Sequence, residues 1–486
     1  METETTEAER VSYNPKAILG GLAVFAAMLM LPAPEGLSPE GWRLAALVAL
    51  MAIWWVTEAI PVYATGLVPL AGFPLLGIAS IGAAAAPYAN PIIFLFLGGF
   101  LIAAAMQATG LHQRIALHVL ARTGTGSRQL VGGFMLTAAF LSMWVSNTAT
   151  AVMMVPIAMS VIAITVADDG VHAPRGGLDT ALLLAVAYGA SIGGIATLIG
   201  TPPNAFLAGY MAQEYGLEIG FAQWMLFALP LSLIMLGCCW LTLTRLAFHL
   251  DGRPIEGVAA TLGQALADIG PIRRPEKTVA AVFVCAAAAW IAQPLLVTVI
   301  PNLSDTVIAM LAALALFVIP AGGGKPALNW SHASRVPYGL LLLFGGGLSL
   351  AAAFDSTGLA LWLALGLGAA ADLPAILVIL LIVAVIVFLT ELTSNIATTA
   401  AMVPLLAGVA VGAGLHPLLL TAPAALAASC AFMLPVATPP NAVIFGAGHV
   451  TIPQMARAGI WLNMFAIIVV TLMAYALLGL AFPLIG

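Results

Sequence analysis

Residues 140–156 read FLSMWVSNTATAVMMVP, and a closely related stretch, FLTELTSNIATTAAMVP, occupies residues 388–404. Nine of the 17 aligned positions are identical, at a constant spacing of 248 residues. Three further motifs recur in the same order: residues 96–99 as 344–347, 109–111 as 357–359, and 201–205 as 438–442. Four recurrences in one order indicate an internal duplication.

The composition indicates that this duplication lies in a membrane. The chain has 486 residues, of which 62% are hydrophobic and only 7% are charged, whereas soluble domains carry about 25% charged residues. The 15 Lys and Arg residues form no basic patch, which excludes nucleic-acid binding. The four cysteines lie in apolar runs, two of them adjacent, which excludes a disulfide scaffold. We therefore predict an all-α polytopic membrane protein.

A transmembrane helix needs about 20 apolar residues, and we predict eleven such spans. They fall near residues 17–31, 44–61, 62–82, 91–110, 180–212, 221–248, 278–299, 303–321, 338–358, 417–446 and 460–484. Two longer stretches, 129–165 and 374–414, are interrupted by polar Ser-Asn motifs, and we predict that both are re-entrant hairpins. The alternative is that each stretch forms two ordinary spans. Two extra crossings return the chain to the same side, so the orientation of the other spans would not change.

The distribution of basic residues predicts the orientation. With the N-terminus in the cytoplasm and the C-terminus in the periplasm, every Lys and Arg except Arg43 lies on the cytoplasmic side, as the positive-inside rule requires. A cleaved signal peptide is the alternative interpretation of the first apolar run. Signal peptides begin with a basic segment, however, whereas acidic residues precede this run, at Glu2, Glu4, Glu7 and Glu9.

The duplication divides the chain into two repeats. We predict a tail and first span in residues 1–43, a first repeat in 44–249, a cytoplasmic loop in 250–277 and a second repeat in 278–486. Each repeat contains three spans, a hairpin and two more spans. Each repeat thus crosses the membrane five times. Because this number is odd, the second repeat begins on the opposite side of the membrane from the first, and the two repeats have opposite orientations. Such inverted-topology repeats are typical of secondary transporters, whose sites lie near the membrane midplane between the repeats.

Polar motifs at membrane depth are the candidate binding elements. Ser146-Asn147-Thr148 and Ser394-Asn395 lie at the hairpin tips, where half-helix N-termini suit an anion and freed carbonyls suit Na⁺. The Pro pairs that follow Thr201 and Thr438 remove backbone donors and predict breaks in two spans. Hydrogen bonding between helices and a purely structural kink are the alternative roles of these motifs.

Charged residues are scarce near these motifs. Acidic residues lie in or beside three spans, at Glu58, Asp355 and Glu391. Glu391 either carries a proton or anchors the second hairpin, and we favour the anchor because Met143 occupies the equivalent position in the first repeat. No Lys, Arg or His lies in the hairpin cores or at the breaks. An anionic ligand would therefore need co-bound cations, since a helix end supplies only about half a charge; a neutral or cationic ligand remains open.

The sequence carries neither a His-Glu-x-x-His metal motif nor a Walker A loop. We therefore predict that the protein is a transporter, is not an enzyme and needs no cofactor. An anion channel is a further alternative, but inverted repeats with broken helices suit alternating access better.

Together these motifs resemble the divalent anion/sodium symporter family. The resemblance covers most of the chain and rests on WWVTEAIP at 54–61, the two Ser-Asn motifs and the two Thr-Pro-Pro-Asn breaks. It implies sodium-coupled symport of C4-dicarboxylates such as succinate, malate or fumarate across the inner membrane, by a homodimer with an elevator mechanism. A scaffold of spans 1–4 and 7–9 would stay fixed while the hairpins and the other spans slide. A sodium-independent exchanger and a carrier of citrate or sulfate are the alternatives.

The resemblance also implies site residues, with Na⁺ as the coupling ion. One sodium ion would bind Ser142, Ser146, Asn147 and the backbone at Gly200; a second would bind Thr390, Thr393, Asn395 and the backbone at Ala437. Substrate carboxylates would meet Ser146, Asn147, Thr148, Ser394 and Asn395, with Thr201, Thr438 and Pro439 nearby. The chain departs from many dicarboxylate carriers at Ile396, which replaces a Thr and removes one hydroxyl donor.

Overall fold

The structure, a computed structural model, describes residues 14–167, 177–366 and 374–482. Within these ranges nearly all regular structure is helical, as the all-α prediction requires. The exception is a short antiparallel hairpin of strands β1 (Pro320–Gly322) and β2 (Lys325–Pro326). Nine of the described helices are long and apolar enough to cross a membrane. The chain is therefore polytopic, whereas the predicted number of eleven spans stays a prediction.

The first half of the chain forms these helices: α1 (Pro15–Met30), α2 (Pro39–Thr57), α3 (Val62–Thr65), α4 (Val68–Leu76), α5 (Ile81–Ala85), η2 (Ala86–Ala89), α6 (Pro91–Thr109), α7 (Leu111–Leu120), α8 (Ser127–Ser142), α9 (Asn147–Ala167), α10 (Leu178–Ile195), α11 (Pro202–Tyr215), α12 (Phe221–Leu241) and η3 (Thr242–Leu246). The second half forms these: α13 (Val258–Ile269), α14 (Arg274–Leu296), α15 (Asp305–Val318), α16 (Trp330–Ala333), α17 (Tyr338–Ser356), α18 (Leu359–Gly366), α19 (Ala375–Leu389), α20 (Asn395–Gly412), α21 (Leu418–Ala428), α22 (Pro439–Gly446) and α23 (Ile452–Ala481).

Two predicted segments differ from the structure. The expected span 62–82 is divided into α3, α4 and α5, because Gly77 ends α4 in the left-handed conformation and the Ser80 side chain caps the start of α5. The segment 250–277, expected to be a loop, contains α13, which buries Val258 and Leu262 on one face. These two residues are four positions apart, a helical spacing that the sequence already contained.

The two Ser-Asn stretches each form two helices joined by a turn. Residues 143–146, the first turn, join α8 to α9, and residues 390–394, the second turn, join α19 to α20. The Pro pairs interrupt the two spans as predicted. Residues 196–201, the first break, separate α10 from α11, and residues 429–438, the second break, separate α21 from α22.

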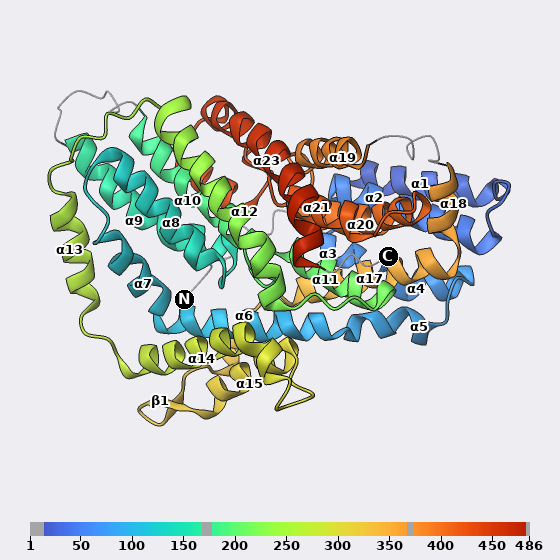
Figure 1. Cartoon of the computed structure of the whole chain (residues 1–486), viewed down its shortest axis with the longest axis horizontal. Helices are drawn as coiled ribbons and strands as arrows, with labels where there is room; N and C mark the ends of the chain where they lie inside the picture. Colours follow the sequence, from blue (N-terminus) through green and yellow to red (C-terminus); the bar gives the residue numbers. More distant parts are fainter. Residues whose placement is uncertain (1–13, 168–176, 367–373, 483–486) are drawn as a thin grey trace.

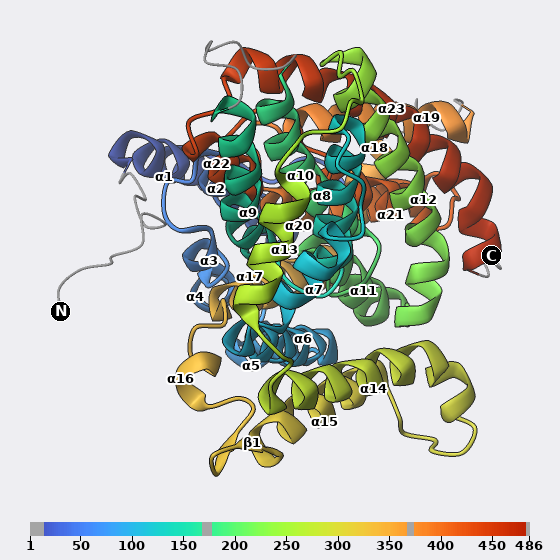
Figure 2. The ribbon, with the colours of Figure 1, turned by 90° about the vertical axis from the view of Figure 1, so that its left-hand side faces the viewer.

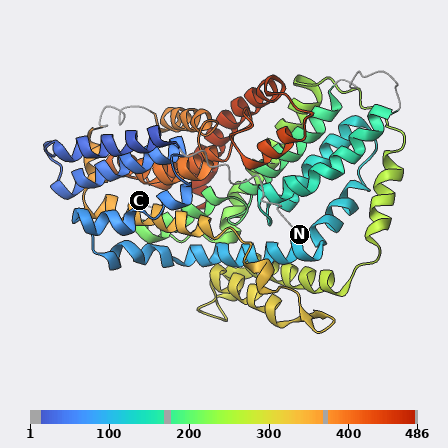
Figure 3. The same cartoon turned by 180° about the vertical axis from the view of Figure 1, so that it is seen from behind.

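The helices form two groups, and α23 packs on α12 in one group and on α21 in the other. Helices α8, α9, α10 and α12 pack together in one half of the molecule, and α18, α20 and α21 pack together in the other (Figure 1). Helices α1 and α2 lie at one end of the long axis and α13 lies at the other (Figure 3). Helices α14 and α15 form a layer below α6, with the β1–β2 hairpin beneath them (Figure 2).

Helix α10 is the most enclosed element, since all of its residues except Asp179 are buried. Its glycines allow α8 to approach closely. A Cβ atom at Gly189 would lie 2.5 Å from the carbonyl oxygen of Met135, and one at Gly193 would lie 2.2 Å from that of Ala139. Small residues at this spacing let helix backbones meet, as is common in membrane proteins.

We expect Gly193→Ala to destabilise the protein by about 1–3 kcal/mol, because the added methyl group meets backbone rather than a movable side chain. The measurement is the thermal unfolding midpoint of the purified protein. Gly237→Ala is the matched control, because Gly237 lies inside α12 and a methyl group added there would meet no neighbouring atom within 4 Å. An equal midpoint for both variants would show that α8 can shift away from α10.

Candidate functional site

Each turn carries the same hydroxyl–amide pair. Before the first turn, the buried Ser142 hydroxyl donates to Oδ1 of Asn147, the first residue of α9. At the start of the second turn, Thr390 Oγ1 lies 2.8 Å from Oδ1 of Asn395, the first residue of α20. In both pairs the two residues are five positions apart. Each hydrogen bond therefore joins the start of a turn to the first residue of the helix that follows it.

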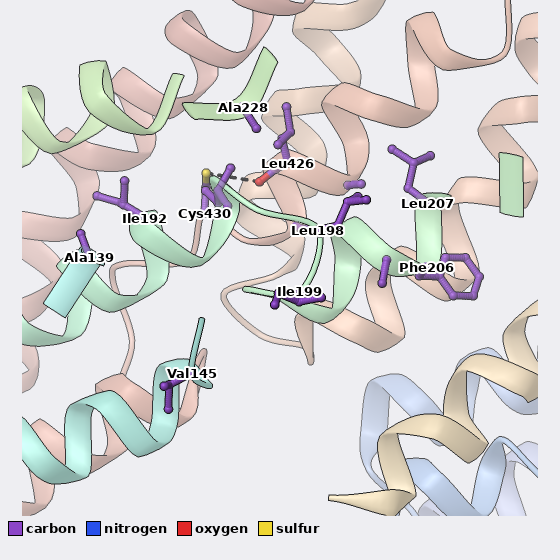
Figure 4. Close-up of a cluster of buried hydrophobic side chains, with 14 of the residues drawn as sticks. Ala139, Val145, Ile192, Leu198, Ile199, Phe206, Leu207, Ala228, Leu426 and Cys430 are labelled. Atoms are coloured by element: carbon purple, nitrogen blue, oxygen red, sulfur yellow. Dashed lines mark hydrogen bonds between the residues drawn. The ribbon is translucent and has the colours of Figure 1, made fainter. Parts of the chain in front are cut away.

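The first break is enclosed by apolar side chains. Figure 4 shows Ile192, Leu198 and Ile199 around it, and Leu426 and Cys430 beside it. Leu198 and Cys430 are completely buried. Water therefore cannot satisfy the backbone groups that the interrupted helix frees, and protein groups must do so.

The Asn residue of each Thr-Pro-Pro-Asn motif supplies those hydrogen bonds. Asn204 Nδ2 donates to the carbonyl oxygens of Gly194, Ile195 and Thr197, at 3.3, 3.0 and 2.8 Å. Asn441 Nδ2 donates to the carbonyl oxygens of Ala431 and Leu434, at 3.3 and 3.0 Å. Among the described residues, the Oδ1 atoms of both Asn side chains are buried without a hydrogen-bond partner.

Each turn is bonded to the neighbouring break, but with different chemistry. In the first half, Thr197 Oγ1 donates to the carbonyl oxygen of Met143 at 2.6 Å. In the second half, the Glu391 carboxylate accepts from the backbone N–H groups of Phe432, Met433 and Leu434 at 2.7–3.0 Å. It also accepts from Asn463 Nδ2 at 2.8 Å.

These bonds agree with the predicted anchoring role of Glu391. All four of its partners are donors, which suits an ionised carboxylate and leaves no acceptor for a carboxyl proton. Of the two other acids, Glu58 is exposed and ends α2 with a left-handed φ of 45°. Asp355 is also exposed, near the end of α17.

The expected residues of the first sodium site lie together. A Cβ atom at Gly194 would lie 2.6 Å from Asn147 Oδ1 and 3.0 Å from the carbonyl oxygen of Gly200. Ser142 bonds to the same Asn147 oxygen. Ser146 is half-buried, and its Oγ accepts from the N–H of Ala149 at 3.3 Å. A hydroxyl, an amide oxygen and a backbone carbonyl thus meet at Gly194, and such freed carbonyls coordinate Na⁺ in transporters.

The expected residues of the second sodium site are less closely grouped. Thr390 Oγ1 lies 2.8 Å from both Asn395 Oδ1 and the carbonyl oxygen of Ala428. Thr393 Oγ1 instead bonds within its own helical hairpin, to the carbonyl oxygen of Leu389 and to Thr398 Oγ1. Ala437 is buried, and its N–H donates to Leu434. Ala428 is therefore a carbonyl ligand candidate that the sequence motifs did not indicate.

The expected substrate residues precede or begin four helices. Ser146 precedes α9, Thr201 precedes α11, Ser394 precedes α20 and Thr438 precedes α22. The side chains of Ser146, Asn147, Thr148, Ser394, Asn395 and Ile396 are half-buried, those of Thr201 and Thr438 are buried, and that of Pro439 is exposed. Helix α9 packs on α22, and α11 packs on α20, so the helix after each turn contacts the helix after the break of the other half.

The motifs alone did not reveal the roles of Gly194, Asn204 and Asn441. The two Asn residues are visible in the repeated motif, but their carbonyl partners lie seven to ten residues earlier. Gly194 belongs to a Gly pair inside an apolar run, and the close approach of Asn147 and of the Gly200 carbonyl explains it.

Comparison with known proteins identifies the family. The profile described as the sodium:sulfate symporter transmembrane region matches residues 16–480. A Staphylococcus saprophyticus protein named sodium-dependent dicarboxylate transporter SdcS is 39% identical, covering 99% of this chain and 95% of its own. A Staphylococcus aureus protein of the same name is 40% identical, covering 94% of this chain and 90% of its own.

Two solved structures share the fold. The YdaH transporter of Alcanivorax borkumensis superimposes with a TM-score of 0.59 at 16% identity, covering 90% of this chain and 99% of its own. MtrF of Neisseria gonorrhoeae superimposes with a TM-score of 0.54 at 12% identity, covering 94% of this chain and 96% of its own. The family profile spans nearly the whole chain and confirms the resemblance drawn from the motifs. The chain, a multi-pass plasma-membrane transporter and not an enzyme, belongs to the sodium:sulfate symporter family.

Proposed function

We propose that this protein takes up C4-dicarboxylates such as succinate, malate or fumarate together with Na⁺. The observation that carries the proposal is the placement of Ser146, Thr201, Ser394 and Thr438 directly before four helices. Helix N-termini attract anions through free N–H groups and the helix dipole. The names of the staphylococcal relatives support the choice of a dicarboxylate and of sodium dependence.

Sodium coupling follows from the missing positive charge. Residues 129–165 and 374–414, and both breaks, contain no Lys, Arg or His. A dianion bound there would meet only partial charges of about half a unit at each helix end. Sodium ions bound by Ser142, Asn147 and Gly200, and by Thr390 and Asn395, would supply the missing charge beside the anion.

We propose that the two turns and the two breaks move as one transport domain, in an elevator mechanism. Hydrogen bonds join each turn to its break, through Thr197 in one half and Glu391 in the other. Helices α6, α14 and α15 lie outside this hydrogen-bonded unit and would belong to the fixed scaffold (Figure 2). The scaffold would also mediate a homodimer in the inner membrane, with the N-terminus in the cytoplasm.

Ile396 is the reason to consider citrate or sulfate as a second class of substrate. Thr148, in the first half, offers a hydroxyl where the second half offers an apolar side chain. Ile396 is half-buried and packs against the hydrophobic core. A carrier of citrate or sulfate, with a different arrangement of oxygens from a C4-dicarboxylate, would need other donors, so the substrate panel must include both.

Asn147→Ala and Asn395→Ala should each reduce sodium-dependent succinate uptake by roughly tenfold or more. Each loses an amide that the proposed site places against the substrate carboxylate, and a hydrogen bond to a charged group contributes about 1.5–3 kcal/mol. The measurement is uptake into proteoliposomes. Asn329→Ala is the control, because Asn329 caps the short helix α16 and lies outside both turns. Normal uptake by both turn variants would exclude the proposed site.

Sodium and the anion should increase each other's affinity by the same factor, because the two couplings are one free energy. Calorimetric binding of succinate, citrate and sulfate in Na⁺ and in choline gives one factor, and sodium titration with and without the anion gives the other. Equal anion affinity in Na⁺ and in choline would indicate a sodium-independent exchanger or a channel instead.

Ile396→Thr should tighten succinate binding, and Thr148→Val should weaken it. A hydroxyl that donates to a carboxylate contributes about 1.5–3 kcal/mol, although displacing the packed Ile396 side chain offsets part of the gain. Succinate affinities of the wild type and both variants provide the measurement. If Ile396→Thr changes the affinity by less than about twofold, which corresponds to about 0.4 kcal/mol, position 396 does not face the substrate.

A further inference from the structure

Tyr188 connects the two halves of the protein at the second break. It lies in the middle of α10, is fully buried, and donates its hydroxyl to the carbonyl oxygen of Phe432 at 2.6 Å. Its ring also packs edge-to-face on Phe432, with centroids 5.3 Å apart. Phe432 is the same residue whose N–H donates to Glu391.

The segment Phe432–Leu434 is therefore bonded from three directions. Glu391, in the second turn, accepts its three N–H groups. Asn441, after the second break, donates to the carbonyl oxygen of Leu434. Tyr188 donates to the carbonyl oxygen of Phe432 and is the partner that comes from the first half of the chain.

The equivalent carbonyl group near the first break has donors of a different origin from those of Phe432. The carbonyl oxygen of Ile195, which lies 237 residues before Phe432, accepts from Asn204 and from the indole N–H of Trp224 at 3.1 Å. Both of those donors belong to the first half. The tryptophan at the same 237-residue spacing, Trp461, is 47% exposed. At Phe432, the carbonyl oxygen thus accepts from Tyr188 of the first half, whereas Ile195 accepts from donors of its own half.

Helix α10 also ends at the first candidate sodium site. Gly194, which touches Asn147 and the Gly200 carbonyl, lies six residues after Tyr188, about 9 Å along a rigid helix. The same buried helix thus contacts one sodium site through Gly194 and the segment beside the other through Tyr188. A shift of α10 when one site fills would move the Phe432–Leu434 segment directly.

We propose that Tyr188 is a positioning residue that couples sodium binding in one half of the protein to sodium binding in the other. This inference rests on the proposed function, because it requires two sodium sites. The hydroxyl of Tyr188 fixes the second break relative to α10, so that each filled site favours the arrangement that the other needs. Such coupling is a free energy shared by the two sites.

The test is the sodium dependence of succinate uptake by the full-length protein in proteoliposomes. We expect a sigmoidal curve for the wild type. For Tyr188→Phe we expect the half-saturating Na⁺ concentration to rise about threefold or more and the Hill coefficient to fall toward about 1. The KM for succinate at saturating Na⁺ should change less than about twofold, because the Tyr188 hydroxyl bonds to the carbonyl oxygens of Phe432 and Met455, which are not among the proposed substrate residues.

Tyr338→Phe is the matched control, since it also removes a hydroxyl that bonds to a backbone carbonyl, that of Ala333 at 3.1 Å, but at the start of α17 and in neither break. Asn463→Ala is a second variant, because it removes a donor to Glu391 and should shift the sodium curve in the same direction. Unfolding midpoints in Na⁺ and in choline show whether each variant is folded.

The outcomes separate the two proposals. A wild type whose uptake ignores Na⁺ would overturn the proposed function and the coupling together. A sigmoidal wild type with an unchanged curve for Tyr188→Phe would overturn the coupling alone. A Tyr188→Phe protein that is less stable to the same extent in Na⁺ and in choline, with an unchanged sodium curve, would show a purely structural hydroxyl and would also overturn it.

Discussion

The centre of this protein depends on how the peptide groups of two interrupted helices find hydrogen-bond partners away from water. A free N–H or carbonyl group at membrane depth costs several kcal/mol, so an interruption persists only where protein groups satisfy it. Asn204 and Asn441 satisfy carbonyl groups, and Glu391 satisfies N–H groups. Carbonyl groups at the breaks that these side chains do not bind, such as that of Gly200, are free to coordinate an ion.

The same constraint explains the scarcity of charge. A Lys or Arg beside the breaks would supply permanent positive charge but would also hold an anion whether or not an ion is bound. A site built from hydroxyls, amides and helix ends leaves the anion dependent on co-bound cations. The buried Glu391 carboxyl group accepts hydrogen bonds from four N–H donors of the protein itself, so its oxygens are already satisfied within the fold.

The two halves of the chain share motifs but not all contacts. The turn hydroxyl, the Asn that begins the next helix and the Thr-Pro-Pro-Asn motif occur in both. Met143 and Glu391 occupy equivalent positions and bind their breaks through a carbonyl and a carboxylate. Such differences mean that the two proposed sodium sites need not have equal affinity, which would permit an ordered sequence of binding.

The sequence by itself determined the membrane setting, the helical class, the family and the positions of the turns and breaks, because composition and short motifs report local requirements. The family resemblance implied one sodium site at Ser142, Ser146, Asn147 and Gly200, and in the structure Ser142, Asn147 and Gly200 lie together. The sequence did not reveal the division of residues 62–82 or helix α13. Only the tertiary structure decided the partners of Tyr188, Glu391 and Asn463, since these contacts join isolated residues 41 to 244 positions apart. No periodicity along the chain encodes such contacts; they exist because buried donors and acceptors must meet wherever the packed helices bring them.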